Sequence, residues 1–201
     1  MLISRRDTIA RFSVVLTSAT LLLSTYSSAV IGSVPNARLI VPGKSMGKIS
    51  IGEDSALLSW LGTPRNSDAA MGHFWNFYGH KAEGNYTLGV YTVRNDTGST
   101  ANVKQVWTNS PAFHTSGGDR VGSSLRKILR DFPDAKPLSL AGLEHDAGTV
   151  LYDDPRLGIS FQIVHTPGRK CSAILIHPAG QSALSEYLPV PSDTRWDQSI
   201  P

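Results

Sequence analysis

Hydrophobic residues recur along this chain with two different periods, which indicate short helices and strands. Residues 159–163 alternate Ile, Phe and Ile with Ser and Gln, a period of two that predicts a half-buried antiparallel strand. Further strand-forming segments are expected near 73–78, 86–93, 102–108, 149–152 and 171–177. Two segments, 53–61 and 123–132, instead carry apolar residues three and four positions apart, which predicts amphipathic helices.

Both predicted helices have start and stop signals. Glu53 or Asp54 is placed to begin the first helix, and Gly62 with Pro64 is a typical stop pair after it. The second helix is expected to begin at a serine, Ser123 or Ser124, and to end at Phe132 before a proline. Residues 95–98, Asn-Asp-Thr-Gly, predict the turn between the strands near 86–93 and 102–108.

The two helical segments lie within a pattern that occurs twice. Residues 47–52 read G-K-I-S-I-G and residues 117–122 read G-G-D-R-V-G, seventy positions later, and a helix and strands follow each. With a slip of one residue, the apolar positions of the helices also align: Leu57, Leu58 and Leu61 with Ile128, Leu129 and Phe132. Such an internal repeat indicates one supersecondary unit used twice.

The pattern predicts an α+β fold made of two tandem α-β-β-β units. The first unit covers residues 47–108 and the second covers residues 117–177. A helix of about nine residues is not stable alone in water, so each is expected to bury its apolar side on its own antiparallel sheet. Residues 30–46 form a lead-in segment, and residues 178–201 form a C-terminal tail rich in Pro and Asp.

Residues 1–29 have the features of a signal peptide that is removed from the mature protein. Arg5, Arg6 and Arg11 precede a moderately apolar stretch, and Ser-Ser-Ala at 27–29 predicts the cleavage site. Residues 4–9, Ser-Arg-Arg-Asp-Thr-Ile, resemble the twin-arginine export signal, although Thr8 stands where that signal has an aromatic residue. The mature protein is therefore expected in the bacterial periplasm or outside the cell.

The charge of the predicted mature chain argues against nucleic-acid binding. The leader contains three of the 19 basic residues and one of the 16 acidic residues, so the mature chain is nearly neutral. No membrane span is expected in it, because no apolar stretch approaches the ~20 residues that a spanning helix needs. The single cysteine, Cys171, excludes an intramolecular disulfide and is expected to be a buried strand thiol.

The repeated pattern resembles two groups of exported bacterial proteins. Residues 47–64, G-x-I-x-I-G followed by a helix and L-G-T-P, are similar to the SmpA/OmlA (BamE-like) lipoproteins of the outer-membrane barrel assembly machine. They are also similar to the tandem repeats of the β-lactamase inhibitory protein (BLIP) family. This resemblance implies short helices on small antiparallel sheets. The chain lacks both the lipid-anchor cysteine of the first group and the cysteine pairs of the second.

No catalytic set, metal site or cofactor site is predicted. Residues 43–47 match the G-x-S-x-G motif of α/β-hydrolases, but a strand-like segment follows them where that motif needs a helix. A glycine turn between two short strands is the alternative. The histidines have no metal-ligand spacing, and Glu144, His145 and Asp146 are adjacent on a predicted loop, where they seldom act on one atom.

Aromatic residues are the best candidates for a binding site. The candidates lie on three neighbouring predicted strands: Trp75, Phe77, Tyr91 and Trp107. A helix covers only one face of a sheet, and aromatic residues are common at binding hot spots. The alternative is that they fill the core between sheet and helix.

These features favour an exported, non-catalytic binding module with a protein partner in the cell envelope or outside the cell. Two alternatives remain from the sequence. One is an exported hydrolase whose site is assembled by the fold, and the other is a structural component of the envelope.

Overall fold

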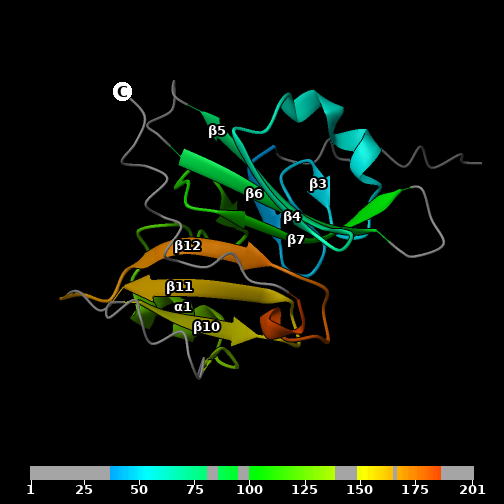
Figure 1. The fold of residues 1–201 in the computed structure, drawn as a ribbon. Coiled ribbons are helices and arrows are strands. Elements are labelled where there is room, and N and C mark those ends of the chain that lie inside the picture. Colours follow the sequence, from blue (N-terminus) through cyan, green and yellow to red (C-terminus); the bar gives the residue numbers. More distant parts are fainter. Residues whose placement is uncertain (1–36, 81–85, 95–99, 139–148, 165–166, 187–201) are drawn as a thin grey trace, which may run out of the picture. The chain divides into compact units, whose positions relative to one another are not determined.

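The computed structural model describes residues 37–80, 86–94, 100–138, 149–164 and 167–186 (Figure 1). The described residues all belong to one compact unit. The predicted signal peptide, the predicted turn at 95–98, residues 30–36 of the lead-in and most of the tail lie outside the described residues.

Strands are the main regular structure of the described residues. The first part of the chain contains β1 (Leu39–Val41), β2 (Ser45–Met46), β3 (Ile49–Ser50), the 3₁₀ helix η1 (Ser55–Leu61), β4 (Asn66–Ala70), β5 (His73–His80), β6 (Tyr86–Arg94) and β7 (Ala101–Thr108). The second part contains β8 (His114–Thr115), the helix α1 (Leu125–Asp131), β9 (Lys136–Pro137), β10 (Thr149–Asp154), β11 (Ile159–Val164), β12 (Cys171–Ile176) and the 3₁₀ turn η3 (Ala183–Ser185).

Eight of these strands form one antiparallel sheet, in the order β4-β5-β6-β7-β12-β11-β10-β9. Each half of the sheet is a meander of four strands, and Figure 1 shows β10, β11 and β12 side by side in the second half. The two halves join where β7 pairs with β12, with Thr108, Trp107 and Val106 opposite Ile174, Leu175 and Ile176. The last strand of each half therefore lies at the centre, and the first strand of each half lies at an edge.

A smaller sheet has the order β3-β2-β1-β8. Its β1–β2 hairpin contains the G-x-S-x-G motif, and Gly43 in the turn has a φ of +68°, which favours glycine. A Cβ at Gly43 would lie 2.6 Å from the carbonyl oxygen of Leu157. The motif is therefore a glycine turn between two short strands, as its alternative reading predicts.

The main core lies on one face of the eight-stranded sheet. It combines side chains of the central strands, such as Val106 and Phe161, with side chains of the small sheet, such as Ile40 and Met46. Leu58 of η1 and Ile128 of α1 are buried in the same cluster. Both helical segments are thus held by one shared core, which stabilises short helices that are not stable alone.

Both helical segments begin at the expected capping residues. Asp54 accepts a hydrogen bond from the backbone N–H of Ala56, and Ser124 accepts one from that of Lys127. Each cap replaces a partner that the first turn of a helix lacks.

The start of each helical segment is attached to the sheet by equivalent hydrogen bonds. The N–H of Gly52 donates to the carbonyl of Val103 at 2.7 Å, and the N–H of Gly122 donates to that of Cys171 at 2.8 Å. In return, Val103 donates to Glu53, and Cys171 donates to Ser123. The helix starts therefore correspond at a spacing of seventy residues.

The predicted α+β fold is wrong. The protein is mostly β, and its two parts do not have separate three-stranded sheets that each carry a helix. Each part contributes four strands to one sheet, and the first segments of both parts contribute to a second sheet. The sequence prediction failed because the pairing of β7 with β12 depends on side chains that meet across the sheet, which local periodicity does not reveal.

The slip of one residue between the two helices is also wrong. The equivalent hydrogen bonds place Leu57 at the position of Lys127 and Leu58 at that of Ile128. Leu58 and Ile128 are buried, whereas Leu57 is 67% exposed. Leu61 and Leu129 are half-buried, and Leu125 and Phe132 are buried as expected.

Candidate functional site

The predicted aromatic residues gather on the sheet face opposite the main core. The ring centroids of Trp75 and Phe77 are 5.6 Å apart, and those of Trp75 and Tyr91 are 5.1 Å apart. Trp107 packs against the same cluster, together with Leu175 of the neighbouring strand β12. The period of two correctly places Trp75 and Phe77 on one face, and strand pairing brings Tyr91 and Trp107 to the same face.

The four aromatic residues differ in burial. Trp75 and Tyr91 are almost completely buried, so most of their surface already contacts this protein. Phe77 and Trp107 are half-buried and retain surface for a partner. The face is therefore partly a second core, but it lies on the side of the sheet away from η1 and α1 and not between sheet and helix, where the alternative reading of the sequence places it.

A buried polar network lies where β10 ends, β11 begins and β12 ends. Asp153 Oδ1 lies 2.9 Å from His177 Nε2 and accepts a hydrogen bond of 2.7 Å from the hydroxyl of Ser160. Asp153 Oδ2 accepts hydrogen bonds from the hydroxyl of Ser182 and the backbone N–H of Ala183, at 3.1 and 3.2 Å. The network therefore attaches the segment that leads into η3 to the sheet.

The hydrogen bonds of His177 define its role. Its Nδ1 lies 3.2 Å from the carbonyl oxygen of Pro178, and its Nε2 faces a carboxylate oxygen that already accepts from Ser160. Both ring nitrogens therefore have polar partners, and His177 connects the end of β12 to β10. Burial raises the pKa of Asp153, but the hydrogen bonds from His177 and Ser160 outweigh this effect and hold that pKa below its ordinary value.

Ser160, Asp153 and His177 are the residue types of a serine-hydrolase triad, but their order differs. In a triad the histidine lies between the serine and the carboxylate and accepts the proton of the serine. Here the carboxylate lies between the other two, and all three side chains are buried. This network connects β10, β11 and the segment after β12. Sequence reasoning missed it because it depends on strand pairing that brings Asp153 and His177 together across 24 residues.

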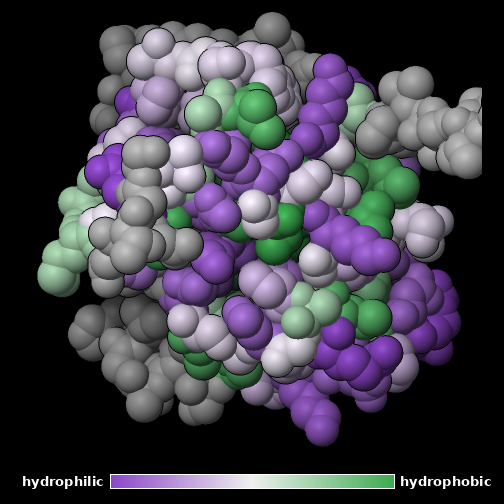
Figure 2. Space-filling model, turned by 90° about the vertical axis from the view of Figure 1, so that its right-hand side faces the viewer, coloured by the Kyte–Doolittle hydropathy of each residue, from purple (hydrophilic) through white to green (hydrophobic). Residues whose placement is uncertain are grey.

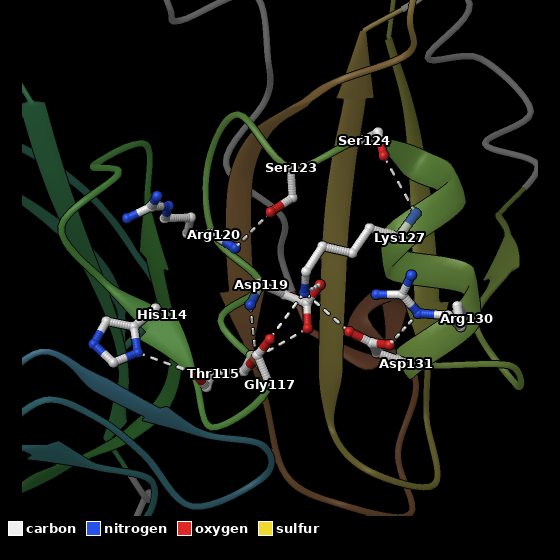
Figure 3. Close-up of polar contacts among 10 residues, drawn as sticks. All are labelled: His114, Thr115, Gly117, Asp119, Arg120, Ser123, Ser124, Lys127, Arg130 and Asp131. Atoms are coloured by element: carbon white, nitrogen blue, oxygen red, sulfur yellow. Dashed lines mark hydrogen bonds and ion pairs between the residues drawn. The ribbon is translucent and has the colours of Figure 1, made fainter.

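A second polar cluster surrounds the ammonium group of Lys127 (Figure 3). Its Nζ donates to a carboxylate oxygen of Asp119, to Asp131 Oδ2 at 2.9 Å and to the carbonyl oxygen of Gly117 at 3.0 Å. Asp119 is buried and also accepts from the hydroxyl of Thr115 at 3.1 Å. The lysine thus ties α1 to the loop that precedes it.

The contacts within this cluster shift the pKa of Asp131 and the pKa of Lys127. Hydrogen bonds from Lys127 and then Arg130 lower the pKa of Asp131 to about 2. Partial burial lowers the pKa of Lys127, but the two aspartates have the larger combined effect, so the pKa is raised. All charges of the cluster are therefore compensated at neutral pH.

The histidines do not form a metal site within the described ranges. His73 Nδ1 is hydrogen-bonded to the hydroxyl of Tyr91, and His114 Nδ1 lies 3.1 Å from the carbonyl oxygen of Thr115. Among the residues that the structure describes, no group of three or more His, Cys, Asp or Glu side chains lies close enough to bind a metal ion. His145, with its acidic neighbours, and His165 lie outside these residues.

Cys171 is buried in β12, and this burial raises the pKa of its thiol to about 12. A reactive cysteine needs a lowered pKa and access to solvent. The predicted buried strand thiol is confirmed.

The surface of η1 carries two exposed hydrophobic residues, Leu57 and Trp60. The sequence pattern predicts that Leu57 is buried and makes no prediction for Trp60. Leu57 is 67% exposed and Trp60 is 54% exposed, and the ammonium group of Lys48 lies 5.6 Å from the centre of the Trp60 ring. At the corresponding positions seventy residues later, α1 carries Lys127 and Arg130. The repeat spacing was the signal that could have identified this pair.

One face of the molecule shows no large hydrophobic area (Figure 2). Figure 2 shows one face of the molecule as mostly hydrophilic, with its hydrophobic side chains in small separate groups. In the part of the chain that the structure describes, no helix is long and apolar enough to span a membrane.

Comparison of the chain with protein families, with curated proteins and with solved structures finds no match. The resemblance to the BLIP and SmpA/OmlA groups therefore stays a prediction.

Proposed function

We propose that this protein is an exported, non-catalytic binding module whose partner is a protein of the cell envelope or the extracellular space. The observation that carries the proposal is the exposed pair Leu57 and Trp60 on η1. The corresponding positions of α1, seventy residues later, carry Lys127 and Arg130. The repeat therefore does not itself require hydrophobic residues at these positions, and most of the surface of Leu57 and Trp60 lies outside the core.

The chemistry of the pair indicates the kind of partner surface that it fits. Tryptophan is enriched at binding hot spots, where it fills an apolar pocket. Lys48 beside Trp60 adds a positive charge at the rim. We infer a partner surface with an apolar pocket and a carboxylate at its edge, because such a surface complements both groups.

The half-buried aromatic residues Phe77 and Trp107 offer a second, smaller contact on the opposite side of the sheet. They support the proposal less strongly, because their neighbours Trp75 and Tyr91 are already buried within the protein. The predicted signal peptide supports the location outside the cytoplasm.

Copurification from the source bacterium tests the proposal. The tagged full chain is compared with the double variant L57K/W60R, which introduces the residue types of α1 at the positions of η1. Met71, which is exposed at the β4–β5 turn, provides the matched control as M71K. We expect the wild type and M71K to retain the same partner, identified by mass spectrometry, and L57K/W60R to lose it.

Two results would contradict this proposal. One is a partner that remains bound to L57K/W60R with unchanged yield. The other is the recovery of no specific protein by the wild type from either the periplasm or the culture medium.

A further inference from the structure

The two edges of the eight-stranded sheet differ in their protection. The edge strand of the second half, β9, has two residues, Lys136 and Pro137. Lysine, proline and short length are the common means by which proteins prevent another strand from pairing with an edge. The edge strand of the first half, β4, has five residues, and neither lysine nor proline is among them.

The backbone of β4 has hydrogen-bonding groups that face away from the sheet. Met71 and Gly72 form a two-residue turn with φ of +47° and +83°, and Ala70 pairs with His73 across it. The pair Ala70–His73 that flanks the turn is hydrogen-bonded, and hydrogen-bonded and non-hydrogen-bonded pairs alternate from it along the two strands. The backbone N–H and C=O groups of Ser67 and Ala69 therefore face outward, away from β5.

Two observations support this orientation and the accessibility of the edge. The N–H of Ser67 donates to the side chain of its neighbour Asn66 at 2.7 Å rather than to β5. The side chains of residues 67–70 are all exposed. A strand that binds here can therefore form hydrogen bonds with the outward backbone groups of Ala69 and, by displacing the side chain of Asn66, with the N–H of Ser67.

The charge of Asp68 distinguishes between two occupants of the edge. In a two-fold pair of two β4 strands in full register, Ser67 of one copy faces Ala69 of the other, and Asp68 faces Asp68. Like charges directly opposite each other destabilise a strand pair. A segment of a different protein with a lysine or arginine at that position instead forms a favourable pair.

We propose that the edge of β4 binds an extended segment of a partner protein, which adds to the sheet antiparallel to β4 with a basic residue opposite Asp68. This inference rests on the proposed function, protein binding, and specifies the form of the bound segment. The interaction uses backbone hydrogen bonds for affinity and Asp68 for selectivity.

A random library of 12-residue peptides displayed on phage, selected against the full chain, provides the probe. The matched variants are A69P, which removes an outward N–H, and A69V, which keeps it. Proline at this position is compatible with an edge strand because its N–H is not bonded to β5. Thermal unfolding checks that both variants fold.

We expect enriched peptides with a two-residue apolar period and one Lys or Arg. Their Kd is expected to be similar for the wild type and A69V and at least tenfold weaker for A69P. Replacing the basic residue of a peptide by Glu should abolish binding, and D68K should restore it. Equal binding to A69P and A69V, or no peptide that distinguishes them, would overturn the inference.

The remaining outcomes separate this inference from the proposed function. If the chain itself forms dimers that A69P dissociates, the occupant is a second copy, and the proposal of a different partner is wrong. If a copurified partner depends on Leu57 and Trp60 but stays bound to A69P, the edge inference fails and the proposed function stands. If peptides bind the edge but no protein copurifies with the wild type, the proposed function fails and the edge site stands.

Discussion

His177 Nε2 lies 2.9 Å from Asp153 Oδ1, and both side chains are buried. A buried carboxylate is stable in the folded protein only if its hydrogen bonds compensate for the lost hydration. Here four donors surround the carboxylate of Asp153 and connect β10 with β11, with the end of β12 and with the start of η3. This pair is therefore expected to be the most sensitive polar contact of the fold.

The variant D153N tests the contribution of this pair to stability. We expect it to lower the free energy of unfolding by about 3–5 kcal/mol, because the partner groups stay buried without their carboxylate. The matched control is D134N, which removes an exposed ion pair with Arg156 and should cost at most about 1 kcal/mol. Urea unfolding at pH 7 provides the measurement, and equal losses for the two variants would contradict the prediction.

The same pair predicts how stability depends on pH. The pKa of Asp153 is lower in the folded state than its ordinary value. Its contribution is therefore fully present above the unfolded-state pKa of about 3.9 and decreases as the pH falls below that value. Urea unfolding between pH 7 and pH 2 should show this acid-dependent loss in the wild type. An equally steep loss in D153N would assign it to other groups.

Ile128 and Leu129 are neighbours on α1 with different environments. Ile128 is completely buried in the main core, so I128A should cost about 2–5 kcal/mol of unfolding free energy. Leu129 is only half-buried, and L129A should cost about half as much, because less apolar surface is lost. Urea unfolding of both variants checks the order. A larger loss for L129A would indicate that the helix packs through a different side.

The pKa of Asp131 reports directly on Lys127. In the wild type, carboxyl NMR titration should give a pKa of about 2. In K127M the pKa should rise toward the ordinary value of about 3.9, because the strongest donor to this carboxylate is lost. R130Q should give a smaller rise, because Arg130 has the smaller effect. A pKa that stays near 2 in K127M would show that the lysine does not bind Asp131 in solution.

The export route is tested by replacing Arg5 and Arg6 together with lysine. The change keeps the charge of the leader but removes the paired arginines that the twin-arginine system recognises. We expect the full-length precursor to accumulate in the cytoplasm, which immunoblotting of cell fractions measures. Continued processing near Ala29 would refute the twin-arginine route while leaving export by another route.

Local features of the fold were readable from the sequence, whereas its long-range pairing was not. The strands with alternating residues, such as β11, and the caps at Asp54 and Ser124 follow from short-range rules. The short strands β4 and β9 lack a strong hydrophobic pattern, because one side of each faces solvent at a sheet edge. Periodicity could not indicate that both halves share one sheet, because a strand pattern is the same whichever strand lies beside it.

The candidate site could likewise be predicted only as far as local periodicity determines it. The common face of Trp75 and Phe77 follows from the two-residue period. The presence of Tyr91 and Trp107 on that face depends on strand register, and the burial of Trp75 and Tyr91 depends on segments that pack on them from elsewhere. Leu57 was assigned to the core because leucine at helical spacing is usually buried. Its exposure could have been inferred only from the repeat, because the corresponding residue of α1 is the charged Lys127.

The seam between β7 and β12 has a consequence for the order in which the protein folds. Within each half, neighbouring strands are close in sequence, whereas the seam joins Thr108 to Ile174 and closes a long loop. Such distant contacts form slowly, so we expect each meander to form first and the seam to close last. Until then both inner strands are open edges with exposed apolar side chains, a state that is prone to aggregation. Transport by the twin-arginine route would place this vulnerable stage in the cytoplasm, where chaperones are present, rather than beyond the membrane.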